Sequence, residues 1–318
     1  MSSQVVVVGS YVQDLTWRCR EFPQAGETII GTFAGGPGGK GSNQAVAAAR
    51  AGAATCFIGA VGRDTFATDA KKFHRAEGIA ARFIAKPAHA TGTAGILVNA
   101  SGQNEIVVAL GANAALAPRD VPAALVRGAR VVVCQHETNL ALNAHVFRLA
   151  RRAGATTVLN PAPMRPDFDA AILGHTDVLI PNETEFCALV NRVSSRALTE
   201  TELAKLSETE LHALCRTLGV ATVIVTLGAR GCLVSQQSGH DFIPAHTGIK
   251  VVDTTGAGDA FVGGFAAGLV EFGGDQLRAA RLATTVAALS VTKPGTAPSM
   301  PTRREIARFL RAESRAGL

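Results

Sequence analysis

Short runs of apolar, mostly β-branched residues recur along the chain and alternate with longer segments of mixed polarity. The first run, QVVVVGS at residues 4–10, is continuous and ends at a glycine, which is typical of a strand buried on both faces of a parallel sheet. Further runs of this kind lie at 55–62, 129–135, 156–163, 176–185, 222–231 and 231–235. Helical patterning separates most of them, most clearly at 138–153, 200–218 and 275–292. The alternation predicts an α/β fold with a mostly parallel central sheet flanked by helices.

Two segments depart from this alternation. Residues 93–110, TAGILVNASGQNEIVVAL, form two β runs around the turn NASG, and residues 14–33 are also extended in character, with FPQAGET as a turn. We expect both to form a small sheet outside the main one, as lid segments at about 12–34 and 92–112 inserted into a single domain that spans residues 1–318. The alternative is a sheet that only stabilises an edge or a dimer.

Composition supports a globular protein that handles a small molecule. Of the 318 residues, 47% are hydrophobic and 18% are charged, so disorder is excluded and the core can be large. The formal net charge is +6, but the basic residues are scattered, and one Trp and one Tyr are too few for stacking on bases. We therefore expect no nucleic-acid partner, while the mild positive charge would favour an anionic small molecule.

The cysteines and apolar segments bear on location. The six cysteines contain no C-x-x-C pair, so we expect reduced thiols and no zinc site. The apolar segment 261–270 is too short to cross a bilayer, and the N-terminal stretch lacks the pattern of a secretory signal. The expected location is the cytoplasm, with no membrane partner.

The first glycine cluster, AGGPGGKGSNQAVAAARAGA at residues 34–53, resembles a phosphate-binding P-loop at first sight. The register fails, because Ala34 stands where the first glycine should be and Gly41 where a Ser or Thr should follow the lysine. The cluster does precede a strong helix former, residues 44–53, so a helix N-terminus points at something polar. A glycine-rich connection without a ligand is the alternative.

The second cluster, VVDTTGAGDAFVGGFAAGL at residues 251–269, reads as a β run ending at Val252, a turn, and a helix beginning near Gly258 or Asp259. The N–H groups of Gly256, Ala257 and Gly258 would then converge at the positive end of a helix dipole and form an anion site. Asp259 in this turn is either a helix cap or a general base beside the anion site, and the local pattern leaves both open.

The two clusters together resemble the signatures of the PfkB carbohydrate kinases, in their ribokinase branch. GGKGSNQAVAAARAGA is similar to the first signature of that family and DTTGAGDAFVGGF to the second. Seven shorter segments follow in family order: FPQAGET, TGTAGILVN, GANAAL, LNPAP, PNETE, TLGARG and KPGTAPS. The resemblance implies ATP-dependent phosphorylation of a sugar hydroxyl, with D-ribose converted to D-ribose 5-phosphate as the first expectation. The alternatives are another PfkB-type kinase for a different pentose, a hexose, a sugar acid or a nucleoside, and a non-catalytic sugar- or nucleotide-binding protein.

The resemblance also implies roles for individual residues. Asp259 would be the base, with Gly256, Ala257 and Gly258 as the anion hole. The sugar would be held by Asp14, Gly38, Gly39, Lys40, Asn43 and Glu137. The nucleotide would be lined by Asn182, Thr226, Gly228, Gly231, Gly258 and Thr284. Asn182 and Glu185 would position Mg²⁺ and its waters. A monovalent cation, typically K⁺, would be bound by Asp253, Thr255, Ser290, Lys293, Gly295 and Ser299.

Two positions depart from the family pattern. Many bacterial ribokinases have N-x-D after the first strand, whereas this chain has Val12-Gln13-Asp14, so an apolar group replaces an amide in the expected sugar site. Thr284 stands where related enzymes often have His or Asn near the adenine. The resemblance further implies a homodimer joined through the lids.

Overall fold

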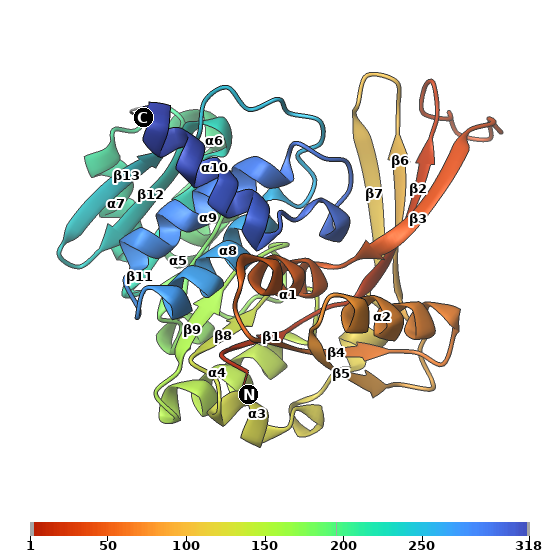
Figure 1. Cartoon of the computed structure of the whole chain (residues 1–318), viewed down its shortest axis with the longest axis horizontal. Coiled ribbons are helices and arrows are strands. Elements are labelled where there is room, and N and C mark those ends of the chain that lie inside the picture. Colours follow the sequence, from red (N-terminus) through yellow and green to blue (C-terminus); the bar gives the residue numbers. More distant parts are fainter. Residues whose placement is uncertain (1–2, 195, 317–318) are drawn as a thin grey trace.

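The computed structural model describes residues 3–194 and 196–316, and its largest element is a nine-stranded sheet (Figure 1). The strand order is β13-β12-β11-β10-β9-β8-β1-β4-β5. The pairs from β11 to β5 are parallel, and only β11–β12 and β12–β13 are antiparallel. The strands are β1 (Val5–Val8), β4 (Thr55–Val61), β5 (Ala80–Ala85), β8 (Val131–Cys134), β9 (Thr156–Leu159), β10 (Val178–Leu179), β11 (Thr222–Thr226), β12 (Gly231–Gln236) and β13 (Gly239–Pro244). The predicted fold class is confirmed.

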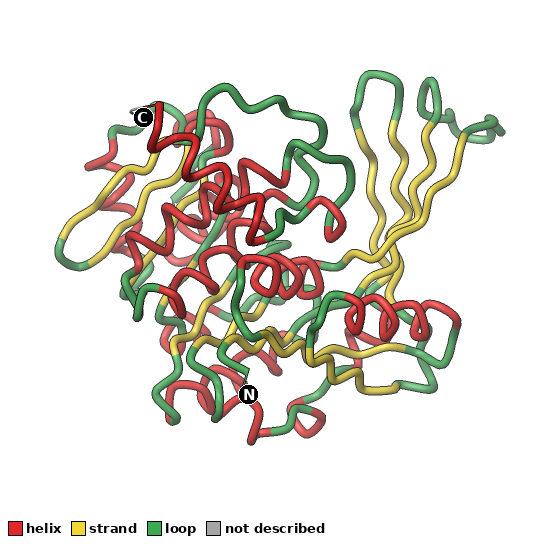
Figure 2. Tube along the Cα trace, in the orientation of Figure 1, coloured by secondary structure: helices red, strands yellow, loops and turns green. Residues whose placement is uncertain are grey.

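Helices cover both faces of this sheet, as the red and yellow segments of Figure 2 show. The helices are α1 (Lys40–Ala51), α2 (Thr65–Ala76), α3 (Ala123–Arg127), α4 (Leu140–Arg152), α5 (Glu183–Ser194), α6 (Glu200–Leu203), α7 (Glu208–Thr217), α8 (Ala257–Glu271), α9 (Gln276–Ser290) and α10 (Arg303–Ala316). Short 3₁₀ turns lie at Gly111–Ala115, Pro118–Asp120, Ala170–His175, Gly228–Arg230 and Ala297–Ser299.

The continuous apolar strands separate two hydrophobic cores. In β1, Val5 and Val7 face the core under α1, α8 and α9, while Val6 and Val8 face the core under α4, α5 and α7. All four side chains are fully buried, because successive residues of a strand point to opposite faces and both faces are covered.

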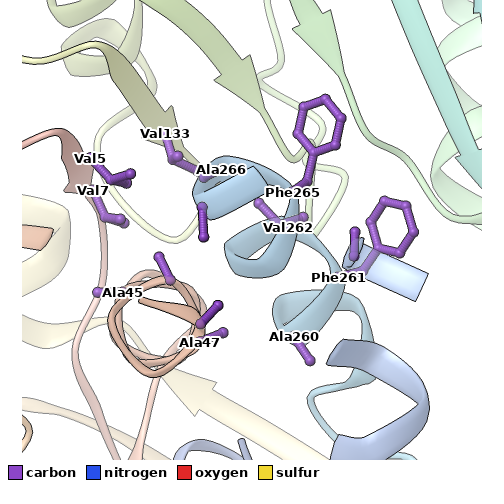
Figure 3. Close-up of a cluster of buried hydrophobic side chains, with 14 of the residues drawn as sticks. Val5, Val7, Ala45, Ala47, Val133, Ala260, Phe261, Val262, Phe265 and Ala266 are labelled. Carbon is purple, nitrogen blue, oxygen red and sulfur yellow. The ribbon is translucent and has the colours of Figure 1, made fainter. Parts of the chain in front are cut away.

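Helices α1 and α8 lie side by side on one face of the sheet (Figure 3). Their small residues allow the two backbones to approach closely. A Cβ added at Gly263 of α8 would lie 2.4 Å from the backbone oxygen of Gln44 and 2.5 Å from the Cβ of Ala47, both in α1. Only glycine fits there, so the two helices that begin at the two glycine clusters are packed against each other without room to slide.

A second, four-stranded sheet projects from one side of the molecule (Figure 1), and we call it the lid. Its strand order is β3-β2-β6-β7, formed by β2 (Val12–Arg18), β3 (Thr32–Gly38), β6 (Gly92–Val98) and β7 (Asn104–Ala109). β6 and β7 form the predicted hairpin around NASG. The first lid segment ends later than expected, because β3 continues to Gly38 and runs directly into α1.

Several predicted elements were wrong in extent. The run 176–185 contains only the two-residue strand β10, because α5 already begins at Glu183 after Pro181 and Asn182. The helix predicted at 200–218 is two helices, since Ser207 and Glu210 form a capping box that starts α7 anew. Residues 251–252 are not a strand, and both valines are more than half exposed. Strands β5 and β13 were missed.

Candidate active site

Two cavities meet at the loop that precedes α8. The first, of about 570 Å³, lies between the lid and the loops at 251–255 and 294–298, and we call it the lid cavity. The second, of about 550 Å³, lies between the β11–β12 turn, the start of α8 and the helix α9, and we call it the α9 cavity. Val251 and Thr254 line both cavities. Two molecules bound in these cavities would therefore face each other across this loop.

The loop ends in the turn that starts α8. Gly256 is the cap residue and has φ +81°, a backbone conformation that glycine adopts without strain. The N–H of Ala257 donates to the oxygen of Thr254 at 3.2 Å, whereas those of Gly256 and Gly258 have no acceptor among the described residues. The helix begins at Ala257, one residue before the predicted range. Two N–H groups at the positive end of the helix dipole thus remain available to an anion.

Asp259 is not the cap of this helix, because its side chain accepts no bond from the first-turn N–H groups. Its carboxylate instead accepts hydrogen bonds from two side chains of α1. The Nδ2 of Asn43 donates to Oδ2 and the Nε2 of Gln44 to Oδ1, both at 2.9 Å. The side chain is only 7% exposed. The close packing of α1 on α8 therefore holds a buried carboxylate in the first turn of α8, next to the two available N–H groups.

A second carboxylate, that of Glu137, is bonded to the first glycine cluster. Glu137, which follows β8, accepts a hydrogen bond from the Oγ of Ser10 at 2.6 Å and another from the backbone N–H of Lys40 at 2.9 Å. Gly39 is the cap of α1, so Lys40 is the first residue of this helix. The acidic side chain thus occupies the N-terminus of α1, where the helix dipole favours negative charge.

The ammonium group of Lys40 lies among three carboxylates. Burial would lower the pKa of Lys40, but the negative charges of Asp259, Glu137 and Glu185 outweigh it and hold the pKa above its ordinary value. Burial raises the pKa of Glu185, although the N–H of Asn182 and the charge of Lys40 oppose this. Lys40 therefore stays positively charged and offsets part of the negative charge of this cluster.

Asp14 is the carboxylate that the lid contributes. It lies on β2 and lines the lid cavity, and its Oδ2 accepts a hydrogen bond from the hydroxyl of Thr296 at 3.2 Å. A Cβ on Gly38 would lie 2.3 Å from that oxygen, so the glycine leaves room for the carboxylate. Burial raises the pKa of Asp14 to about 6, and the charges of Glu137 and Asp259 add to the rise.

The remaining predicted sugar residues differ in placement. Lys40, Asn43, Glu137 and Asp259 are joined by the contacts above but do not line the lid cavity, which reaches only Asp14 of this set. Val12 is 2% exposed at the start of β2 and lines neither cavity.

The predicted nucleotide residues all line the α9 cavity: Asn182, Thr226, Gly228, Gly231, Gly258 and Thr284. They come from β11, its turn, and the starts of α5 and α8, together with α9. The sequence reasoning missed His246, Phe261 and Val291, which also line the cavity. His246 lies in a loop without a motif, and its ring contacts Glu313 and Thr285. Its only signal in the sequence was its position shortly before the second glycine cluster.

Asn182 and Glu185 cap α5 reciprocally. The N–H of Asn182 donates to Oε2 of Glu185 at 3.0 Å, and the N–H of Glu185 donates to Oδ1 of Asn182 at 2.8 Å. Within residues 3–194 and 196–316, no group of three or more His, Cys, Asp and Glu side chains is arranged so that it could hold a metal ion by itself. Asn182 and Glu185 therefore suit Mg²⁺ only in the mode seen beside nucleotide phosphates, in which one protein carboxylate, several waters and the phosphates share the ion.

The predicted monovalent-cation residues fall into two groups. The carboxylate of Asp253 accepts hydrogen bonds from the N–H groups of Thr255 at 2.9 Å and Gly295 at 3.0 Å, and so joins two loops beside the lid cavity. Burial would raise the pKa of Asp253, but these bonds outweigh it and lower the pKa. The hydroxyls of Ser290 and Ser299 donate hydrogen bonds to nearby backbone carbonyls, and the lone pairs of their oxygens can still coordinate a cation. The side chain of Lys293 is bonded to Glu305.

Comparison with known proteins agrees with this geometry. The model of the pfkB family carbohydrate kinases matches residues 2–303. A ribokinase of Mus musculus is 36% identical over 313 residues, which cover 96% of this chain and 94% of the relative. A deoxyribokinase of Salmonella typhi is 34% identical over 313 residues, covering 96% and 98%. The structure of an Arabidopsis thaliana ribokinase complexed with ribose and ATP superposes with a TM-score of 0.83 at 31% identity, covering 98% and 99%.

The match over nearly the whole chain means that this protein belongs to the PfkB family of carbohydrate kinases and is a phosphotransferase.

Proposed function

We propose that this kinase transfers the γ-phosphoryl group of ATP to a hydroxyl of D-ribose and forms D-ribose 5-phosphate. The observation that carries the proposal is the position of Asp259. Its carboxylate is bonded to Asn43 of the first glycine cluster, while the preceding residue, Gly258, lines the α9 cavity. A base at this junction can accept the proton of a sugar hydroxyl as the N–H groups of the α8 turn stabilise the transferred group.

In this proposal each cavity has one substrate. The sugar binds between Asp14, whose carboxylate lines the lid cavity and accepts bonds from its hydroxyls, and the neighbouring group of Glu137, Lys40 and Asn43, which lies outside that cavity. ATP binds in the α9 cavity, with its phosphates at the α8 turn and its base against Thr284. The relative from Mus musculus and the ribose-bound structure from Arabidopsis thaliana support ribose as the sugar.

A second candidate sugar is 2-deoxyribose. It is favoured by the Salmonella typhi relative, which is nearly as similar to this chain as the Mus musculus one. It is also favoured by Val12 at the start of β2, where an apolar side chain replaces the amide of the N-x-D triplet. Nucleosides, hexoses and sugar acids remain the wider alternatives within the family. A non-catalytic binding protein would have no need of a carboxylate held beside an anion site.

Two cations complete the proposal. Mg²⁺ would be held by ATP phosphates, waters and Glu185 near Asn182, and would neutralise charge on the phosphates. K⁺ would be bound by the oxygens of the two loops that Asp253 joins, together with Thr255, Ser290, Gly295 and Ser299. The residues present are oxygen donors, which suit both ions.

The proposed assembly is a cytoplasmic homodimer joined through the lids. Asp14, Thr16 and Arg18 of β2 line the lid cavity, so Leu15 and Trp17 face the opposite side of the lid. That outer side also carries Phe33 and Val107, which are 58% and 77% exposed. An exposed apolar sheet face of this kind is typical of an interface, and a second lid would cover it. Five of the six free cysteines are buried, as expected of a reducing compartment.

The test is a panel of sugars and nucleosides assayed with ATP and Mg²⁺, in K⁺ and in Na⁺. We expect the highest kcat/KM for ribose and a product phosphorylated at O5, identified by ³¹P and proton NMR. A kcat/KM at least tenfold higher for 2-deoxyribose or another acceptor would replace ribose in the proposal. Binding of sugar and ATP without any turnover would support the non-catalytic alternative.

A further inference from the structure

Three buried amide side chains lie behind the carboxylate of Asp259. Gln44 of α1 and Gln135 after β8 are fully buried, and Asn160 after β9 is 7% exposed. The Nε2 of Gln44 donates to Oδ1 of Asp259 at 2.9 Å and to Oδ1 of Asn160 at 3.0 Å. The Oε1 of Gln44 accepts from the Nε2 of Gln135 at 2.6 Å. Both N–H groups and the oxygen of the Gln44 amide therefore have fixed partners.

The direction of this chain follows from its anchor. The Nδ2 of Asn160 donates to the backbone oxygen of Ile180 at 2.9 Å, and a carbonyl oxygen can only accept. Asn160 must therefore turn its own oxygen toward Gln44, and Gln44 must present its NH₂ group to both Asn160 and Asp259. The orientation of Gln44 is thus imposed by the backbone of the sheet.

Gly9 leaves space for this row of hydrogen-bonded amides. A Cβ at Gly9 would lie 2.0 Å from Oε1 of Gln135 and 2.8 Å from the Cα of Gly41, so a larger residue at this position would displace the Gln135 amide. Gln135 makes its one side-chain hydrogen bond to Gln44, and its Oε1 has no partner in the described part of the chain. The Gln135 amide therefore serves to orient Gln44.

Asn43 and Gln44 differ in what they can reach. Asn43 bonds the other carboxylate oxygen, and its buried Oδ1 has no partner among the described residues, which leaves it available to a sugar hydroxyl. Neither residue lines the lid cavity or the α9 cavity, but Gln44 is fully buried, and both N–H groups and the oxygen of its amide already have partners within the protein. Any effect of Gln44 on the reaction must therefore act through Asp259.

We infer that Gln44 is a positioning residue for Asp259, oriented by Asn160 and Gln135. Its hydrogen bond fixes the rotation of the carboxylate so that Oδ2 is directed at the acceptor hydroxyl and away from the sheet. This inference rests on the proposed role of Asp259 as the base, and it holds for whichever hydroxyl the kinase phosphorylates.

The test compares three variants that keep side-chain length. Gln44→Met removes the donor, and we expect kcat to fall about 10- to 100-fold, or about 1.4–2.7 kcal/mol in activation free energy, with KM for ATP unchanged within twofold. Gln44→Glu places a carboxylate oxygen against Asp259, so its kcat should fall further at pH 8 and recover partly toward pH 6, where one shared proton restores a donor. The third variant, Gln135→Met, removes a group that orients Gln44 but leaves the donor to Asp259 in place, so it should lower kcat less than Gln44→Met does.

A crystal structure of Gln44→Met gives a readout that does not depend on the sugar. We expect the Asp259 carboxylate to rotate from its position against Asn43. The inference is overturned if the carboxylate keeps its rotamer and kcat stays within twofold of wild type, or if Gln44→Glu shows no recovery at lower pH. The proposed function fails separately, if the wild-type protein does not phosphorylate ribose; the same variants are then compared on the acceptor it uses, and the Gln44→Met structure decides the inference if it uses none.

Discussion

The hydroxyl of Thr296 donates a hydrogen bond to the carboxylate of Asp14 at 3.2 Å, and this contact joins the lid strand β2 to a loop of the main body. Thr296 lies beside Gly295, whose N–H bonds Asp253, so the same loop also contacts the proposed cation site. Replacing the Asp14 carboxylate would therefore change both the proposed sugar site and the connection between the lid and the body.

We expect Asp14→Ala to raise KM for the sugar while KM for ATP stays nearly constant. The lid cavity contains Asp14 and the α9 cavity does not, so the lost hydrogen bonds concern one substrate only. Loss of a charged hydrogen bond costs roughly 1.5–3 kcal/mol, or about 10- to 150-fold in kcat/KM for the sugar. Steady-state kinetics with each substrate varied would check this, and a rise in KM for ATP alone would contradict it.

The raised pKa of Asp14 makes stability depend on pH. Burial raises this pKa from 3.8 to about 6, so the folded protein binds the proton more tightly than the unfolded chain does. The protonated form therefore favours folding, and ionisation of Asp14 destabilises the folded state increasingly from about pH 4 to pH 6. We expect Asp14→Asn to raise the free energy of unfolding at pH 8 by about 1–3 kcal/mol and to leave it unchanged near pH 4. Urea unfolding at both pH values is the measurement; equal stability of variant and wild type at pH 8 would rule this out.

Asp259→Asn should remove most turnover while both substrates still bind. The amide keeps the size of the side chain but cannot accept a proton, and loss of a general base lowers kcat by about 10²–10⁴-fold. Calorimetric titration with sugar and with an ATP analogue would show binding within a few-fold of wild type. A near-normal kcat would mean that Asp259 is only structural.

A cation between the two loops that Asp253 joins would hold the turn before α8 in place. We expect turnover of the wild type to be higher in K⁺ than in Na⁺ or a bulky organic cation at equal ionic strength, by a coupling of about 1–3 kcal/mol. Asp253→Ala should lose this difference between salts. Equal wild-type rates in the three salts would contradict the proposed cation site.

Phe33→Asp should prevent the proposed dimer from forming. Phe33 packs on Trp17 with ring centroids 5.3 Å apart on the outer side of the lid, and a carboxylate there would be buried without a partner in a lid-to-lid interface. Sedimentation velocity of the variant beside wild type measures the change. A wild type that sediments as a monomer at every concentration would contradict the proposed assembly.

The parts of the candidate site that could be predicted from the sequence are those whose residues are close together along the chain. Gly256, Gly258 and Asp259 are neighbours in the chain, so their turn could be recognised before the fold was known. Gln44 could not be assigned, because its partners Asp259 and Asn160 lie 215 and 116 residues away and only the packing of α1 on α8 brings them together. Strand β5 was missed for a different reason: it is an edge strand of sequence AARFIA, in which Arg82 interrupts the apolar run and only Phe83 and Ile84 are large apolar residues.

The absence of a side chain at Gly263 has a consequence for how this enzyme can diversify. Because α1 and α8 touch at the backbone there, Asn43, Gln44, Gly258 and Asp259 form one rigid block, which contains the proposed base. The lid cavity, where we propose that the sugar binds, is in contrast walled largely by strands of the lid, and Thr16, Arg18, Ile96 and Asn104 on these strands lie outside that block. Acceptor preference can therefore drift during evolution while the phosphoryl-transfer apparatus stays unchanged, and a library confined to these lid positions is the economical route to a kinase for a new sugar.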